Sequence, residues 1–380
     1  MKKDAWTVKK KLALLLTKSF VAMMKKSVFI LSCLIILFSC KKNEIRTIVF
    51  NEPEDCRALA GHISGVTITP LENDGHYFGW GADLVCAEDG YVVVDKENTQ
   101  VFHYGPDGRF LNNIGVRGNG PGEYRNICNV QTSNSDVFIF SAPETIINHF
   151  NLDGTFRAKR TEKISGMQYR QIDEGLLVYH GYGTPAKCKV TLHSDAGDKK
   201  FLPYSSNVTA FDDFNPTMTK CGNQIFVRDP LERTVYVYQQ GDIEPYLTFD
   251  FGKYNIEDSF FDLDYMSSGE YLRTHECYMI ARYLHNDEMS LIEINRTTDS
   301  AVCYGLLLGG KWIWFNVGAL DNDPFAGAIK AIDGKDLVCL VDPSLLIKPD
   351  ANLGGIITDS SVLSSLKSTD NDVIIRIQIQ

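Results

Sequence analysis

The sequence predicts an all-β protein, a six-bladed β-propeller with short helical insertions. Two observations support this fold class: pairs of short alternating strands recur along the chain, and Asp-Gly turns separate the clearest of them. Four-stranded propeller blades repeat at about 40–50 residues, with insertions in surface loops. The second strand of each blade is expected to start near residues 91, 136, 175, 224, 277 and 336.

The composition excludes several protein classes. The 380 residues are 44% hydrophobic and 23% charged, which is typical of a globular protein and excludes disordered, collagen-like and coiled-coil chains. Residues 41–380 carry 30 basic and 47 acidic side chains, a net charge of −17. So acidic a body repels phosphate backbones, and nucleic acid is therefore not expected as a partner.

Residues 1–40 have the pattern of a secretory signal. Lys25-Lys26 precede an apolar run, Val28–Phe38, that is shorter than the roughly 20 residues of a membrane span. The run ends in Leu37-Phe38-Ser39-Cys40, which resembles a bacterial lipobox. This predicts a lipoprotein signal peptide, with Cys40 as the lipidated first residue of the mature chain and Met24 as the true start. The alternative is an uncleaved membrane anchor.

Either alternative places the body outside the cytoplasm, in the cell envelope. The expected location is lipid-anchored in the outer membrane, with periplasmic and surface exposure both open. Residues 41–61 are expected to form a tether and first strand, and residues 62–380 the propeller. The eight cysteines after Cys40 could form disulfides, but buried free thiols are favoured because several lie in apolar patterns such as Leu84–Ala87. No C-x-x-C pair occurs, and no metal or cofactor is predicted.

The first two blades have the clearest pattern. Gly90–Asp95 and Val101–Tyr104 alternate and lead into the turn Gly105–Gly108, and Asp136–Phe140 and Ile146–Phe150 lead into a second Asp-Gly turn. An Asp-Gly turn between alternating apolar runs is a strong hairpin signal. Looser copies are Leu176–Tyr179 with Cys188–Leu192, Gln224–Val227 with Val235–Tyr238, Tyr278–Ala281 with Leu291–Ile294, and Leu337–Val341 with Val373–Ile379.

The last strand has no room for another blade after it. Val373–Ile379 is therefore expected to close the ring beside an N-terminal strand, either Ile45–Phe50 or Ile63–Leu71, which would hide the open sheet edges. Asn255–His275 and Pro349–Lys367 interrupt the rhythm and are expected to be helical insertions. Two unrelated β-sandwiches remain the alternative fold.

A run of motifs after the first blade resembles a known family. Gly105-Pro-Asp-Gly108, Ile114-Gly115 and Gly118-Asn-Gly-Pro-Gly-Glu-Tyr124 follow in register. The chain resembles the six-bladed β-propeller lipoproteins of Bacteroidetes, relatives of NHL-repeat propellers, most strongly over residues 62–160. The resemblance implies a propeller fold and an envelope location, and it transfers no reaction and no catalytic residue. Asn371-Asp372 departs from the Asn-Pro that this family usually has before its last strand.

The glycine-rich segment Gly118–Tyr124 has two interpretations. Its glycines would allow a phosphate cradle, but no strand-to-helix context follows, so a loop between blades is favoured, with Tyr124 packed between them. Arg117 and Arg125 flank this loop and are candidate ligand-binding residues facing the central channel. The aromatic run Trp312–Phe315 could stack on a sugar or a peptide, although packing between blades is favoured.

The predicted function is a binding or scaffold module for a glycan, a peptide or a protein partner of the envelope. The competing hypothesis is an enzyme, a lyase or hydrolase, acting at the mouth of the central channel. Such an enzyme needs converging side chains from several blades, for which Arg170, His275 and Arg282 are the candidates. They are also the remaining candidate ligand-binding residues, and no catalytic residue is assigned. A structural subunit of a larger envelope complex is the third possibility.

Overall fold

A computed structural model describes residues 45–73, 75–79, 81–142, 145–204, 215, 217–299, 302–317, 329–347 and 360–380. The chain divides into two units, Met1–Ile45 and Arg46–Gln380, and the second holds the propeller. The predicted signal peptide, with Met24 and Cys40, lies outside the described residues. No helix in the described ranges is both long enough and apolar enough to cross a membrane.

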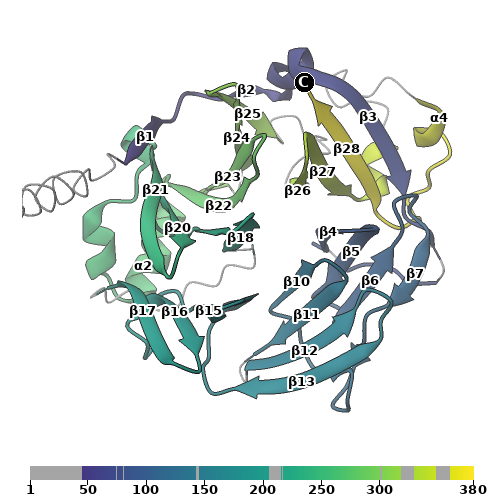
Figure 1. The fold of residues 1–380 in the computed structure, drawn as a ribbon. Coiled ribbons are helices and arrows are strands. Elements are labelled where there is room, and N and C mark those ends of the chain that lie inside the picture. Colours follow the sequence, from purple (N-terminus) through teal and green to yellow (C-terminus); the bar gives the residue numbers. More distant parts are fainter. Residues whose placement is uncertain are drawn as a thin grey trace, which may run out of the picture. The chain divides into compact units, whose positions relative to one another are not determined.

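In the described residues, Arg46–Gln380 forms a ring of six sheets, which confirms the six-bladed propeller (Figure 1). Each blade has four antiparallel strands, which follow one another from the centre of the ring outwards. The first blade holds β4 (Asp83–Ala87), β5 (Gly90–Asp95), β6 (Gln100–Tyr104) and β7 (Phe110–Asn113), and the second β10 (Asn129–Ser133), β11 (Asp136–Ser141), β12 (Thr145–Asn151) and β13 (Phe156–Glu162). The third holds β14 (Gln168–Ile172), β15 (Gly175–Tyr179), β16 (Cys188–Ser194) and β17 (Gly197–Pro203).

The second half of the ring repeats this plan. The fourth blade holds β18 (Met218–Cys221), β19 (Gln224–Val227), β20 (Thr234–Gln239) and β21 (Asp242–Asp250), and the fifth β22 (Tyr278–His285), β23 (Ser290–Arg296), β24 (Val302–Leu308) and β25 (Lys311–Val317). The sixth holds β26 (Ile329–Asp333), β27 (Asp336–Val341), β28 (Val373–Ile379) and β3 (Ile63–Pro70).

Both faces of a blade are buried between its neighbours, which explains the nearly continuous apolar runs of the second strands. In β5, Tyr91 and Val93 pack with residues of the sixth blade such as Val338. The alternate residues Val92 and Val94 pack with the second blade. Because successive side chains of a strand point to opposite faces, one strand contributes to two adjacent cores.

The ring closes where a strand near the N-terminal end of the propeller pairs with the last strand of the chain. β28 is antiparallel to β3, with Ile375 opposite Ile68, so the expected closing strand is the Ile63–Leu71 alternative. Residues 46–61, which precede β3, run along the outer edges of the fourth and fifth blades. There β1 (Arg46–Val49) pairs in parallel with β21, and β2 (Glu54–Asp55) pairs in parallel with β25. The N-terminal segment thus covers the outer edges of three successive blades (Figure 1).

The fifth blade corrects one sequence-based expectation. The strand expected near residue 277 as the second of its blade is the innermost strand, β22, and the second strand is β23. β22 is buried along most of its length and therefore has the apolar pattern of a second strand.

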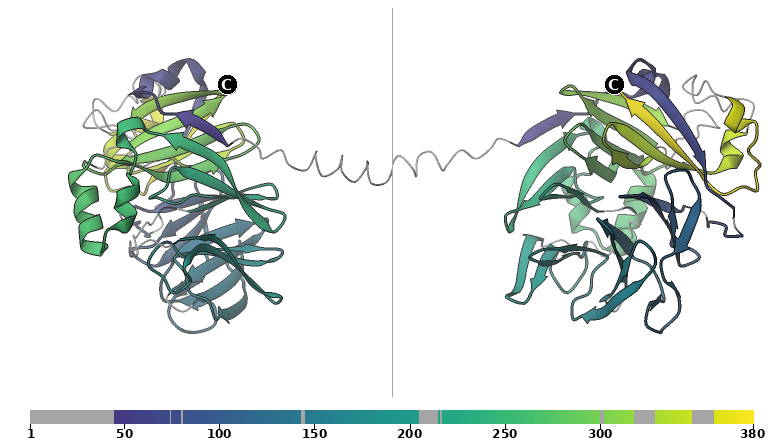
Figure 2. Two further views of the ribbon diagram at one scale, coloured as in Figure 1. Left: turned by 90° about the vertical axis from the view of Figure 1, so that its left-hand side faces the viewer. Right: turned by 45° about the vertical axis from the view of Figure 1, so that its right-hand side comes forward.

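Helices lie in both segments where the sequence predicts insertions. The first, Asn255–His275, contains η3 (Asp258–Asp262) and α2 (Tyr265–Thr274), and η2 (Gly252–Tyr254) directly precedes it. These helices project beyond the strands in the side view of Figure 2. Asp264 caps α2 by accepting a hydrogen bond from the Ser267 amide at 2.8 Å. In the second, α4 (Ser360–Leu363) falls within the expected range, and α3 (Pro343–Leu346) precedes it.

Packing within the ring confirms two further predictions. Seven of the cysteines are described, all as free thiols, and Cys188, Cys277, Cys303 and Cys339 are buried. Burial raises the pKa of the Cys303 thiol to about 12, which makes it a poor nucleophile. The aromatic run in β25 packs between blades: Trp312 and Trp314 face the fourth blade, with Trp312 5.4 Å from Phe249 between ring centroids, and Phe315 faces the sixth.

The glycine-rich loop between the first two blades binds its own carboxylate. Glu123 Oε2 accepts hydrogen bonds from the amides of Asn119 at 2.7 Å and Gly120 at 2.6 Å. The amides that a phosphate would need are therefore occupied. Tyr124 is 2% exposed, packs between the two blades and donates from its hydroxyl to the Ile114 carbonyl at 3.0 Å. The structure confirms the interpretation as a loop between blades.

The closing sheet tolerates the departure at Asn371-Asp372. Asn371 is buried and donates from its side chain to the Glu72 carbonyl at 3.0 Å, and the Leu71 amide donates to the Asp372 carbonyl at 3.2 Å. Burial, followed by the nearby Asp342 carboxylate, raises the pKa of Asp372 to about 6, while Lys330 opposes the shift.

Replacing the Asp372 carboxyl tests how much its burial beside the closing strand changes the free energy of unfolding. Since the pKa is raised in the folded state, ionising Asp372 destabilises the fold above pH 6, and the penalty disappears below about pH 4. Asp372→Asn should raise the free energy of unfolding by about 1–3 kcal/mol at pH 7.5 and by almost nothing at pH 4. Urea unfolding across this pH range measures the difference, with the exposed Asp195→Asn as control. An equal effect at every pH would contradict the assignment.

A second substitution tests the packing of the glycine-rich loop. Gly115 has φ +69°, and an added Cβ would lie 2.7 Å from the Phe150 ring and 2.8 Å from Tyr124. Gly241 has φ +81° and no atom within 4 Å of the same position. Gly115→Ala should therefore cost about 2–4 kcal/mol of stability, whereas Gly241→Ala should cost about 1 kcal/mol from backbone strain alone. Denaturant unfolding measures the loss of stability in each variant. Equal losses would contradict a steric overlap of the added Cβ at Gly115 with Phe150 and Tyr124.

Candidate functional site

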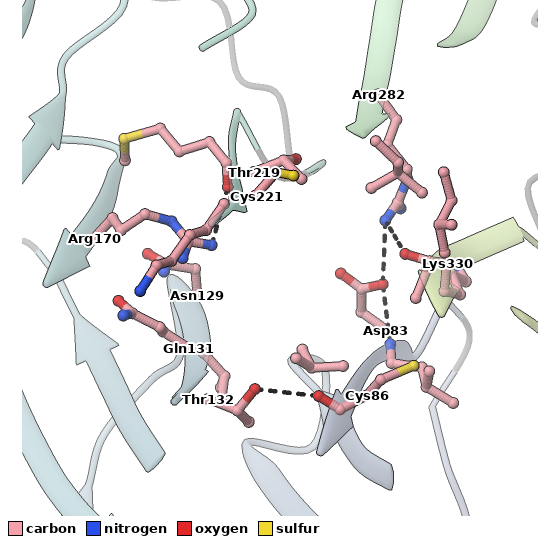
Figure 3. Close-up of a pocket in the computed structure, with 18 of the residues that line it drawn as sticks. Asp83, Cys86, Asn129, Gln131, Thr132, Arg170, Thr219, Cys221, Arg282 and Lys330 are labelled. Atoms are coloured by element: carbon pink, nitrogen blue, oxygen red, sulfur yellow. Dashed lines mark hydrogen bonds and ion pairs between the residues drawn. The ribbon is translucent and has the colours of Figure 1, made fainter. Parts of the chain in front are cut away.

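The inner strands of all six blades surround a cavity of about 550 Å³ at the centre of the ring (Figure 3). β4, β10, β14, β18, β22 and β26 each contribute lining residues. Cavities of this size that gather polar groups from several elements are typical of small-molecule binding sites. The cavity is therefore the candidate functional site.

Amide side chains on the wall connect the second and third blades. Asn129 donates to the Tyr169 carbonyl at 2.7 Å and accepts from the Tyr169 amide at 3.0 Å. Gln131 makes the same pair of bonds with Gln171, at 2.9 Å and 2.8 Å. Each side chain thus replaces the backbone partner that a neighbouring strand would supply.

Hydroxyl and guanidinium groups connect three more pairs of blades. Thr132 donates to the Cys86 carbonyl at 3.2 Å, between the second and first blades, and Thr219 donates to the Tyr283 carbonyl at 2.7 Å, between the fourth and fifth. Arg282 donates from Nη1 to the carbonyl of Lys330 at 3.2 Å, between the fifth and sixth. Much of the polar lining therefore serves the fold as well as the cavity.

A charged cluster occupies one side of the cavity. Arg282 is buried, with Nη1 3.6 Å from Asp83 Oδ1 and Nε 3.6 Å from Glu293 Oε2 (Figure 3). Burial alone would raise the pKa of Asp83, but the attraction of Arg282, Lys330 and Lys96 outweighs it and lowers that pKa. Asp83 is therefore ionised at neutral pH and balances part of the positive charge.

Arg170 lies on the opposite side of the cavity from this cluster (Figure 3). It is half-buried, and Nη2 donates to the Met218 carbonyl at 3.2 Å. No described carboxylate lies within ion-pair distance of it. Burial lowers the pKa of Arg170 to about 10, so the guanidinium stays charged at neutral pH.

The lining is positive although the body of the protein is acidic. Among the described residues it holds five cationic side chains and two carboxylates: Lys96, Arg170, Lys220, Arg282, Lys330, Asp83 and Asp287. Burial also lowers the pKa of Lys330. His285 lines the cavity too, where burial lowers its pKa and Nδ1 lies 2.7 Å from the Ser290 hydroxyl.

The structure brings together two of the five candidate residues. Arg170 and Arg282 line the cavity from opposite sides. His275 is the exposed C-cap residue of α2, with its ring stacked on Tyr271 at 4.2 Å, and does not line the cavity. Arg117 and Arg125 are exposed on the glycine-rich loop outside the cavity, because it is Tyr124 that turns inward there. That any of these residues binds a ligand stays a prediction.

Sequence reasoning missed Asp83, Lys96, Lys330 and His285. Asp83 and Lys330 lie on β4 and β26, the first strands of their blades. Comparing the first strands of the six units, instead of the second strands, would show that most carry a charged or amide side chain. That recurrence is the signal that could have identified the wall of the cavity.

Comparisons with known proteins agree with the fold. A presumed exported protein from Bacteroides fragilis has a similar structure, with a TM-score of 0.72 and 15% identity, covering 89% of this chain and 100% of that one. A member of the DUF4221 family from Bacteroides vulgatus has a TM-score of 0.53 at 8% identity, covering 84% of this chain and 97% of that one. No curated protein matches the sequence.

One family model covers the ring almost completely. It matches residues 59–376, from the helix η1 (Cys56–His62) before β3 into the closing strand β28. The match therefore includes all six blades together with the pairing that closes them. This chain belongs to the family described as a Domain of unknown function, DUF4934.

Proposed function

We propose that this protein is a lipid-anchored binding module of the cell envelope that takes its ligand in the central cavity. The observation that carries the proposal is the cavity itself, to which all six inner strands contribute. Its lining of amide, hydroxyl and charged groups suits a polar ligand such as a glycan, a peptide or a loop of a partner protein. Residues on rigid strands hold such a site in a fixed geometry.

The wall of the cavity favours binding over catalysis. Arg170 and Arg282 lie on opposite sides, and each donates to a backbone carbonyl. His285 is engaged with a hydroxyl on its own blade. A lyase or hydrolase needs an acid or base beside a reacting atom, and this arrangement does not bring these three side chains to one point.

The anchor is supported by the sequence. The basic residues, the apolar run and the terminal Cys40 form a lipoprotein signal. The similar B. fragilis protein is itself described as a presumed exported protein, which agrees with an envelope location. The acidic body and the short polar stretch after Cys40 suit a domain held near a membrane and exposed to solvent.

Binding at the cavity can be tested with a blocking variant. Lys220 is exposed and lines the cavity, so Lys220→Trp should obstruct it, whereas Lys311→Trp changes an exposed lysine on the outer strand β25. The full chain in detergent is screened by thermal shift and calorimetry against neutral and charged oligosaccharides and short peptides. A ligand at 100 times its Kd should stabilise the fold by about 2.7 kcal/mol. Lys220→Trp should weaken that binding at least tenfold and Lys311→Trp should not. Equal binding by both variants, or no binding across the panel, would contradict the proposal.

The anchor has its own test. Cys40→Ser should abolish incorporation of radiolabelled palmitate and move the protein from the membrane to the soluble fraction of the envelope. The Cys33→Ser variant controls for loss of a cysteine within the apolar run. Persistence of the Cys40→Ser protein in membranes would favour the uncleaved anchor instead.

A further inference from the structure

Among the described residues that line the cavity, cationic side chains outnumber carboxylates. On one side, Asp83 is within 3.6 Å of Arg282 and is also attracted by Lys330 and Lys96. On the other side, Arg170 has no described carboxylate partner within ion-pair distance. A cation withdrawn from water without a counter-ion is costly, so the arrangement is poised to accept an anion.

On its side of the cavity, Arg170 is the hydrogen-bond donor that is available to a ligand. Asn129 and Gln131, on the adjacent strand β10, each use both ends of their amide on the backbone of β14. Arg170 uses one N–H on the Met218 carbonyl. A guanidinium carries five N–H donors in a planar fork that matches the two oxygens of a carboxylate.

The charge and size of the site restrict the anion. Arg170 is the one half-buried guanidinium on this wall, and Arg282 and Lys330 are grouped near Asp83 on the facing wall. The fifth lining cation, Lys220, is exposed to solvent, so a single negative charge is matched better than two. This favours a carboxylate over a phosphate dianion. The volume of about 550 Å³ suits a small molecule and excludes a folded partner domain.

Resting on the proposed function, we propose that the ligand of the central cavity is a small carboxylic acid whose carboxylate is held by the guanidinium of Arg170. The cations of the facing wall, Lys330 and Lys96, add attraction at longer range and draw the acid into the cavity. Arg170 is thus the specificity-determining residue of the site.

The experiment compares matched probes that differ in the acidic group. Calorimetry on the full chain in detergent uses D-galacturonate against D-galactose and succinate against succinamide, with inorganic phosphate and sulfate as further arms. The acid of each pair should bind and its neutral partner should bind at least tenfold more weakly. Phosphate binding better than both acids would replace the carboxylate by a phosphate ligand and overturn the proposal. Equal weak binding of every anion would indicate an adventitious ion only.

The variants separate recognition from a structural role. Arg170→Met should weaken binding of the acids about 10- to 100-fold, and Arg170→Lys should restore part of it. Arg109→Met, which changes an exposed arginine outside the cavity, should leave binding unchanged. Without ligand, Arg170→Met should not lower the Tm, because it removes an unbalanced, half-buried charge. A lower Tm together with unchanged affinity would reduce Arg170 to a connection between blades.

The outcomes also distinguish this inference from the proposed function. If neutral sugars or peptides bind, and Lys220→Trp blocks them, while both acids fail, the cavity is a binding site but not one for acids. If the acids bind and Lys220→Trp has no effect, the site lies elsewhere and both proposals fail. If neither acids nor neutral probes bind, both are again overturned.

Discussion

The ring depends on one strand pairing, that of β28 with β3. Its partners come from the two ends of the described chain, so the sixth blade is complete only when both ends have been placed. Without this pairing β28 would expose a row of unpaired backbone groups at the outer edge of the sixth blade. The same N-terminal segment covers the rims of the fourth and fifth blades through β1 and β2. Closure and edge protection are therefore properties of one continuous stretch.

The radial arrangement of the blades also determines the polar groups at the centre of the ring. Six inner strands meet around one axis, and their side chains can reach either the backbone of the next strand or the cavity. Asn129, Gln131 and Thr219 connect neighbouring strands and are satisfied by doing so. Arg170 and Arg282 lie on opposite sides of the cavity. Arg282 has Asp83 and Glu293, whereas Arg170 has one carbonyl among the described residues, so the balance of charge is unequal between the two walls.

The sequence predicted the ring better than it predicted the site, for a physical reason. Period-2 alternation and Asp-Gly turns are local, so strands such as β5 and β11 could be located directly. In the fifth blade, the innermost strand β22 was predicted as the second strand. The helical insertion lengthens the connection before β22 and changes the spacing of the repeat, and β22 is as apolar as a second strand. The residues that line the cavity come from distant parts of the sequence, and no local pattern shows that they converge. Asp83 and Lys330 lie far apart in sequence and come together only because the ring closes. His275 was expected both at the end of a helical insertion and at the channel, and only the first expectation holds.

The contrast between an acidic body and a positive cavity has a selective effect. Residues 41–380 carry a net charge of −17, which repels anions at a distance, but salt at physiological strength screens that repulsion beyond about 8 Å. At the cavity wall, the half-buried guanidinium of Arg170 would act on a bound acid at contact, where attraction is strongest. A small acid with one charge would experience little of the screened repulsion by the acidic body and the full attraction of Arg170. A long polyanion experiences the repulsion along its whole length and cannot enter. In the proposed site, the two fields together would therefore select for charge sign and for size at the same time.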